Sequence, residues 1–431
     1  MKSIEPRVEC AAAASPPSPE VQKRTDLFAS LFSQLWRNTT DASGTWGETY
    51  RPEQQMETEA RVEDMISNSL EFGDASKENA VLQMQRVKSS VRNLVVRSLE
   101  PGHRQKTEEM LEKFTHAGDE FVREARKFDD TLTPDDLFQA LRNLWIINSM
   151  QAAYDVPICT TRSGVAYSLL YPYTDNFLDD PTVTSQDKRA FSIFLGRRLV
   201  GIEVSRSTKL ASTVSQLVGM IEADYPRHLF PGVYDSLLAI HRAQETSLLQ
   251  QSHNYGTKQP EILDISVRKG GASVLADAYL SKGDLTSAEA EFAFGYGVFL
   301  QLIDDLQDVG SDLSNGHKTL FTLAVPDGPL DGMANRLLRF VDSVLSADSY
   351  LSTGRTGALA ELVNKSCRSL ILESIALHSN LYSEQYLESI ERFSPLRFGR
   401  IRTLHERMQE RRRQAGKALK GGRFARALAN A

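Results

Sequence analysis

The stretch Gly295–Val309 reads GYGVFLQLIDDLQDV: it is apolar, free of proline, and ends with three carboxylates in five residues. On a helix of 3.6 residues per turn, four residues at i, i+3, i+4 and i+7 share one face: Gln301, Asp304, Asp305 and Asp308. Apolar residues fill the positions between them, which predicts a largely buried helix. Because carboxylates on such a helix lose their hydration, a bound cation is the usual compensation, and carboxylate oxygens suit Mg2+.

A second acidic stretch begins at Tyr171 and reads YPYTDNFLDD up to Asp180. It sets Asp175 and Asp179 one helical turn apart. About 130 residues separate the two acidic stretches, enough for several helices of ordinary length to intervene. If the two helices face each other, their carboxylates form a clamp for several Mg2+ ions around a diphosphate.

These two motifs resemble the Asp-rich motifs of class I isoprenoid synthases, which include trans-prenyl diphosphate synthases, squalene and phytoene synthases, and terpene cyclases. The segment QLIDDLQD at 301–308 is similar to the FQxxDDxxD motif of chain-elongating synthases, with Leu300 in place of the Phe. The segment DNFLD at 175–179 resembles DDxxD, with Asn176 in the second position. The resemblance covers roughly residues 160–325, and the second motif is the more specific half.

The resemblance implies an all-α fold, a class I isoprenoid synthase-type helical bundle around a central cavity. It also implies a site with several Mg2+ ions. Asp305 is then expected to orient metal-bound water, and Gln301 to stabilise a carbocation or hold a water. The implied metal ligands are Asp175, Asp179, Asp304 and Asp308, with Asp305 next to them; the implied diphosphate ligands are Lys269 and Lys318, with Arg162, Arg206 and Arg268 as weaker candidates.

The implied activity is the Mg2+-dependent ionisation of an allylic prenyl diphosphate. Chain-elongating synthases carry a GGKxxRP-like segment before the first motif and paired arginines soon after it, and this chain has neither at that spacing. The sequence therefore favours a terpene cyclase, a lyase that acts on one prenyl diphosphate. A chain-elongating or squalene/phytoene-type condensing prenyltransferase stays open, as does a non-catalytic helical subunit of a partner synthase. Assembly as a homodimer is also open.

Composition narrows the class of protein. The chain has 431 residues, of which 41% are hydrophobic and 25% charged, as in ordinary globular proteins. Its formal net charge of −6 argues against general nucleic-acid binding. Three widely spaced cysteines give neither a disulfide framework nor a zinc site, which fits a reducing cytoplasm. No apolar run is long enough for a membrane span, and we expect no secretory signal.

Composition also changes along the chain. We expect a disordered leader at 1–25, N-terminal helices at 26–150, a catalytic core at 151–396 and a basic helix or tail at 397–431. Strand patterns are nearly absent, and helical spacing recurs, for example at 271–280. The tail is read as a solvated helix. Alternatively, Arg397, Arg400 and Arg402 contact a diphosphate, and the arginines at 411–413 contact an anionic membrane surface.

A further acidic pair, Asp135–Asp136, lacks the apolar flanks of the two motifs. It follows Pro134 at a predicted helix start, where carboxylates are favoured by the positive end of the helix dipole. We therefore interpret it as structural, and we interpret Asp129–Asp130 in the same way. The eight histidines form no HxxxH or HExxH pattern, so zinc is not indicated.

Overall fold

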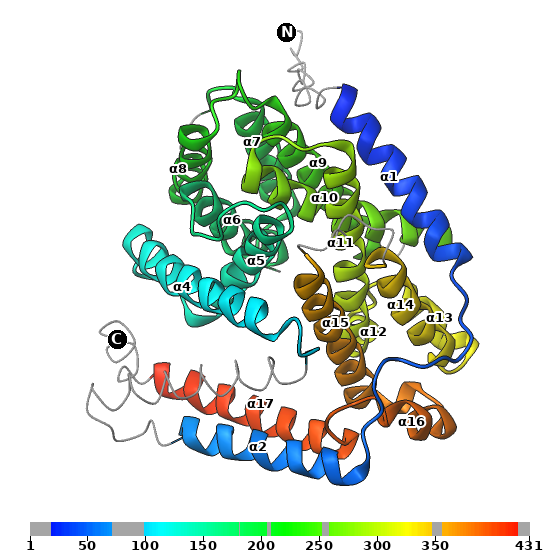
Figure 1. Ribbon diagram of the computed structural model, residues 1–431. Helices are drawn as coiled ribbons and strands as arrows, with labels where there is room; N and C mark the ends of the chain where they lie inside the picture. Colours follow the sequence, from blue (N-terminus) through cyan, green and yellow to red (C-terminus); the bar gives the residue numbers. More distant parts are fainter. Residues whose placement is uncertain are drawn as a thin grey trace, which may run out of the picture. The chain divides into compact units, whose positions relative to one another are not determined.

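The computed structural model describes residues 19–70, 99–180, 182–204, 208–251, 258–346 and 356–420. Throughout these ranges the regular structure is helical and no strand occurs, so the prediction of an all-α protein is confirmed (Figure 1). No helix in these ranges has both the length and the apolar character needed to cross a membrane.

The chain divides into two compact units, and both are discontinuous in sequence. Unit 1 contains residues 1–30, 114–249 and 271–297, and unit 2 contains the rest. The divisions fall within four helices, so the units do not follow the boundaries expected at residues 150 and 396. These helices are α1 (Pro19–Asn38), α4 (Arg104–Phe128), α10 (Gln259–Lys282) and α11 (Ser287–Gln307).

Helix α1 starts inside the segment expected to be a disordered leader. It begins at Pro19, because Val21, Thr25 and Phe28 supply a face that becomes buried. Burial of these side chains offsets the entropy lost on ordering the chain. The predicted leader therefore extends too far at its C-terminal end, and residues 1–18 lie outside the described residues.

Unit 1 is built on helix α6, which packs against α5 and α8. Side chains such as Leu144, Ile147, Leu169 and Leu217 are fully buried in it. The helices that lie wholly in this unit are α5 (Pro134–Ala153), α6 (Arg162–Asp179), α7 (Ser185–Val200), α8 (Lys209–Asp224) and α9 (Pro231–Ser247).

Threonine caps set the starts of four of these helices. The side chains of Thr133, Thr161, Thr184 and Thr208 each accept a hydrogen bond from a backbone N–H of the first turn. At Thr133 the carboxylate of Asp136 bonds back to the cap residue's N–H and completes a capping box. The interpretation of Asp136 as a structural carboxylate is confirmed.

Unit 2 is built on α15, which packs against α14, α16 and α17. Its core contains Phe321, Leu337, Phe340 and Ile371, all fully buried. The helices that lie wholly in this unit are α2 (Pro52–Leu70), α12 (Val309–Asn315), α13 (Leu320–Ala324), α14 (Asp331–Val344), α15 (Gly357–Leu377), α16 (Glu384–Glu391) and α17 (Phe398–Lys420). Short 3-10 turns occur at Leu248–Gln251, Val325–Asp327 and Ser379–Leu381.

Helices α10 and α11 approach each other closely within unit 1. A Cβ atom on Gly271 would lie 2.3 Å from ring carbons of Phe294, which is itself fully buried. Gly271 is therefore needed for this contact, and it sits in the middle of α10. The helix expected at 271–280 in fact starts twelve residues earlier, at Gln259.

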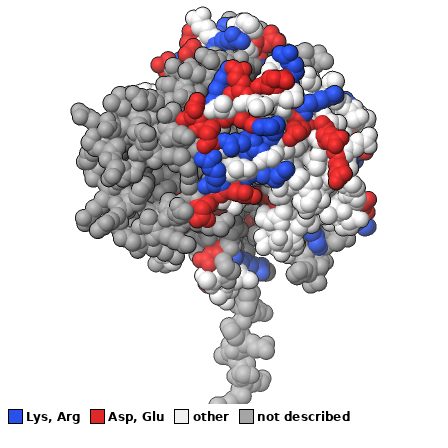
Figure 2. Space-filling view, turned by 90° about the horizontal axis from the view of Figure 1, so that it is seen from below, with Lys and Arg blue, Asp and Glu red and all other residues white. Residues whose placement is uncertain are grey.

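Helix α17 pairs with α2 through charged side chains. Arg397 donates to Glu59 at 2.8 and 2.5 Å, and Arg400 and Arg407 both donate to Glu63. The hydrogen bonds from Arg397 and Arg407 lower the pKa values of Glu59 and Glu63 respectively. Figure 2 shows acidic and basic side chains interleaved on the face seen from below, where Figure 1 has α2 beside α17.

These contacts correct the alternative reading of the basic tail. Arg397 and Arg400 bind carboxylates of α2, and Arg402 donates to the carbonyl oxygen of Ala376 at 3.2 Å. The three arginines therefore hold α17 in unit 2. The side chains at 411–413 lie outside the described residues, so membrane contact through them stays a prediction.

Candidate functional site

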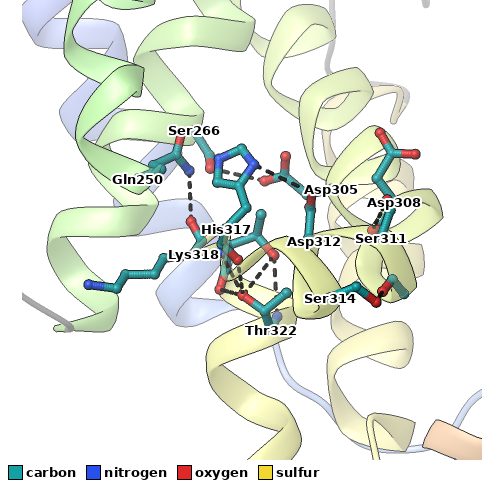
Figure 3. Close-up of polar contacts among 12 residues, drawn as sticks. Gln250, Ser266, Asp305, Asp308, Ser311, Asp312, Ser314, His317, Lys318 and Thr322 are labelled. Carbon is teal, nitrogen blue, oxygen red and sulfur yellow. Dashed lines mark hydrogen bonds and ion pairs between the residues drawn. The ribbon is translucent and has the colours of Figure 1, made fainter. Parts of the chain in front are cut away.

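The second acidic motif occupies the end of α11 in unit 2. Its three carboxylates differ sharply in environment: Asp305 is buried, Asp304 is half-buried and Asp308 is exposed. The helix ends at Gln307, and Asp308 lies at the junction with α12 with φ −90° and ψ 3°. Figure 3 shows the side chains of Asp305 and Asp308 pointing away from each other.

Asp305 is held in place by two side chains. Its Oδ2 accepts from Ser266 Oγ at 3.0 Å, and its Oδ1 accepts from Gln301 Nε2 at 2.8 Å. Burial raises the pKa of Asp305 to about 6, although the hydrogen bond from Gln301 and the charge of Lys269 oppose the rise. The amide of Gln301 therefore positions a carboxyl group, a role that differs from the expected stabilisation of a carbocation.

The basic residues expected to bind diphosphate near this motif lie in three different settings. Lys269 is close enough to Asp305 for its positive charge to lower the pKa of that carboxyl group. Arg268 forms an ion pair with Asp264 on its own helix, at 2.8 Å. Lys318 is joined to Gln250 through its backbone, and Figure 3 shows its side chain pointing away from Asp305 and Asp308. Of the three, Lys269 is the one that the structure brings to the motif.

The first acidic motif lies at the end of α6 in unit 1. Asp175 is half-buried, and Thr174 Oγ1 approaches its Oδ1 at 3.3 Å. Asn176 is exposed and donates to Asp136 Oδ1 at 2.9 Å. The side chain of Asp179 lies outside the described residues. Asp180 caps the helix end and accepts from both the N–H and the hydroxyl of Thr182.

One expected diphosphate ligand, Arg162, is not brought to this motif. Arg162 begins α6, thirteen residues before Asp175, and a rise of 1.5 Å per residue separates them by about 20 Å along the helix. Its guanidinium lies 3.9 Å from Asp224 and is 58% exposed. Arg206 lies outside the described residues.

A cavity opens beside the first motif, also within unit 1. Side chains of α6, α7 and α9 line it, among them Tyr167, Tyr171, Thr174 and His241 with several leucines. The cavity has a volume of about 40 Å³, enough for a few waters or a small apolar group. Asp175 follows Thr174 directly, so the acidic motif is next to the cavity wall.

The tyrosines of this cavity belong to a polar network that the sequence did not reveal. Tyr171 Oη bonds to Tyr167 Oη at 3.2 Å and to Ser273 Oγ at 2.8 Å. Burial first, and then the charges of Asp277 and Asp175, raise the pKa of Tyr171. The sequence does hold a signal of this network, because the spacing of four polar residues places them on one face of α10: Ser266, Lys269, Ser273 and Asp277.

Asp277 is the most deeply buried carboxyl of this network. It has no exposed surface, its Oδ1 accepts from Asn143 Nδ2 at 3.2 Å, and its Oδ2 has no hydrogen-bond partner among the described residues. Burial raises the pKa of Asp277 well above its usual value, with the Asn143 contact acting in the opposite direction. A protonated, uncharged Asp277 is the form that this environment favours.

Four aromatic residues lie close to the two acidic motifs in the sequence, namely Tyr173, Phe177, Phe294 and Phe299. Phe294 and Phe299 are fully buried. Tyr173 donates to Asp129, and Phe177 packs on Phe191 with ring centroids 4.9 Å apart. Phe294 and Phe299 therefore belong to the core, whereas Tyr173 and Phe177 are half-buried.

Within the described ranges, no group of three or more His, Cys, Asp or Glu side chains is arranged to hold a metal ion by itself. Mg2+ is often bound by one or two carboxylates, with substrate phosphates and water supplying the remaining oxygens. The donor set of Asp304 and Asp308, one turn apart and all-oxygen, fits that mode. The two motifs lie in different units, so the expectation that they face each other stays a prediction.

Comparisons with protein-family models, with curated proteins and with solved structures find no match to this chain. The likeness to isoprenoid synthases thus rests on the motifs and on their surroundings.

Proposed function

We propose that the protein is a Mg2+-dependent class I isoprenoid synthase that ionises an allylic prenyl diphosphate, and that it acts as a terpene cyclase. The observation that carries the proposal is the second motif. There a buried carboxyl, Asp305, is fixed by Ser266 and Gln301 beside the half-buried Asp304. Carboxyl groups buried at such a cost are commonly retained where a ligand is bound.

In this proposal each residue of the motif has a defined task. Asp304 and Asp308 would hold the cation, and Lys269 would bind an oxygen of the diphosphate. Asp305, locked by its two hydrogen bonds, would orient the groups around Asp304. Mg2+, when bound, would act as a Lewis acid that neutralises the charge of the departing pyrophosphate.

The cavity in unit 1 has room for only a few waters or a small apolar group, so the choice of a prenyl substrate rests on the two acidic motifs and their resemblance to those of isoprenoid synthases. The choice of a cyclase over a prenyltransferase rests on the sequence, which lacks the second-substrate motifs of chain-elongating enzymes.

The test is the substitution Asp304→Ala. It removes a ligand that the reaction requires, so Mg2+-dependent release of pyrophosphate from an allylic diphosphate should fall by at least ~100-fold. Circular dichroism should show an unchanged helical signal. The matched control is Asp327→Ala, an exposed carboxylate outside the motif, which should leave the rate unaltered. Full activity in Asp304→Ala would rule out the assigned role.

A further inference from the structure

The junction between α11 and α12 is secured by Ser374 of α15 and by His378, the residue that directly follows α15. Ser374 Oγ donates to the carbonyl oxygen of Leu306 at 2.8 Å, and His378 Nε2 bonds to that of Gln307 at 3.0 Å. Because a carbonyl oxygen only accepts, the His378 ring carries its proton on Nε2. Carbonyl groups in the last turn of a helix lack intrahelical donors, so these bonds satisfy the end of α11.

The His378 ring also lies against the start of α12. A Cβ atom on Gly310 would lie 2.8 Å from His378 Cε1 and 3.1 Å from Nδ1. Glycine is therefore the residue that lets the ring reach this backbone. The imidazole thus contacts both sides of the junction, Gln307 before it and Gly310 after it.

Asp308 lies at this junction, directly after α11 and before α12. Its N–H bonds to the carbonyl of Asp304 at 2.9 Å, and its own carbonyl accepts from Asp312 at 2.8 Å. Its ψ of 3° departs from the helical value, which marks the boundary between α11 and α12. The geometry of the junction therefore fixes where the Asp308 carboxylate points relative to Asp304.

We infer that His378 is a positioning residue for the metal-binding carboxylates. It holds the junction in the conformation that lets Asp304 and Asp308 bind one cation, and Ser374 supports it one turn earlier on α15. This inference rests on the proposed function, in which those two carboxylates bind Mg2+.

The experiment measures Mn2+ binding, by electron paramagnetic resonance, to the full chain in the presence of inorganic pyrophosphate. This measurement requires no turnover. His378→Ala should weaken Mn2+ binding by ~10-fold or more, since it removes support behind a ligand. His378→Gln keeps an amide N–H near the Nε2 position, and its affinity should stay within ~3-fold of the wild type.

A control separates positioning from loss of stability. Tyr386→Phe removes a buried hydrogen bond to Asn335, 3.0 Å long, in the same unit but between α16 and α14. It should lower the melting temperature and leave Mn2+ affinity unchanged. Equal Mn2+ affinity in His378→Ala and wild type would overturn the inference.

The two possible failures are distinguishable through Asp304→Ala. If wild type binds Mn2+ and Asp304→Ala does not, the proposed site exists, and the His378 variants alone decide the inference. If wild type and Asp304→Ala bind Mn2+ equally weakly, the proposed function fails, and the positioning role fails with it.

Discussion

Among the described acidic residues, Asp305 and Asp277 are the buried carboxyl groups whose pKa values are raised. Each accepts hydrogen bonds from neutral side chains, and burial raises the pKa of each. Asp277 lies beside the tyrosines of the cavity, whereas Asp305 lies beside the proposed metal ligand Asp304. Burial without a permanent counter-charge costs stability when the group ionises, and sites that bind ligands are where such costs are commonly retained.

The raised pKa of Asp305 predicts how stability depends on pH. A rise from 3.8 to about 6 means that the folded state binds the proton more tightly than the unfolded state does. The contribution of Asp305 to the free energy of unfolding should therefore be greatest below pH 4, and it should fall by about 3 kcal/mol as pH rises through 6. In Asp305→Asn, which cannot ionise, this fall should be absent.

Urea unfolding with a chelator present, at a series of pH values from 4 to 8, measures the effect. Asp308→Asn is the control, because Asp308 is exposed, and its profile should follow that of the wild type. Parallel profiles for Asp305→Asn and wild type would show that Asp305 is not protonated preferentially in the folded protein.

At the scale of helices, the sequence predicts where a helix begins better than it predicts which helices pack together. Threonine followed by a first-turn acid or proline marks a helix start, and the capping box at Thr133 was predictable for that reason. The start of α10 was missed because Gly270–Gly271 resembles a helix break, whereas Gly271 serves a close contact with Phe294. Such a contact depends on a residue about 20 positions away in the sequence and leaves no local signal.

This contact gives a prediction for helix packing. In Gly271→Ala the new methyl group would overlap the Phe294 ring, so the free energy of unfolding should fall by roughly 1–3 kcal/mol. The double variant Gly271→Ala/Phe294→Leu should recover part of the loss. Gly102→Ala, where no atom lies within 4 Å, serves as the control in the same urea titration. A stable Gly271→Ala protein would show that α10 and α11 are further apart.

At the candidate site too, contacts between residues far apart in the sequence leave no local signal. The residues 301–308 could be recognised from their own spacing, and Lys269 from its resemblance to a family motif. Ser266 and His378 reach α11 from other helices, so no spacing within the motif points to them. Arg162 and Asp175 lie on the same helix, and their closeness in sequence does not reveal that about 20 Å of helix separates them.

At the scale of the whole molecule, the two acidic motifs belong to two compact units that share four helices. The cavity lies in unit 1 with Asp175, and the junction held by His378 lies in unit 2 with Asp304. The chain has a formal net charge of −6, which repels an anionic substrate. Basic groups such as Lys269 and bound cations would have to offset this charge at the proposed site. The proposed activity should therefore be tested on the full chain, which contains both motifs.

The most direct measurement incubates the purified full-length protein and Mg2+ with allylic diphosphates of 10, 15, 20 and 25 carbons, with and without isopentenyl diphosphate. Mass spectrometry then identifies the products. We predict a hydrocarbon or alcohol, with pyrophosphate, from one allylic substrate alone. Longer diphosphates formed only with isopentenyl diphosphate would contradict a cyclase and indicate a prenyltransferase. No product from any substrate would contradict an enzyme of this class and favour a non-catalytic subunit.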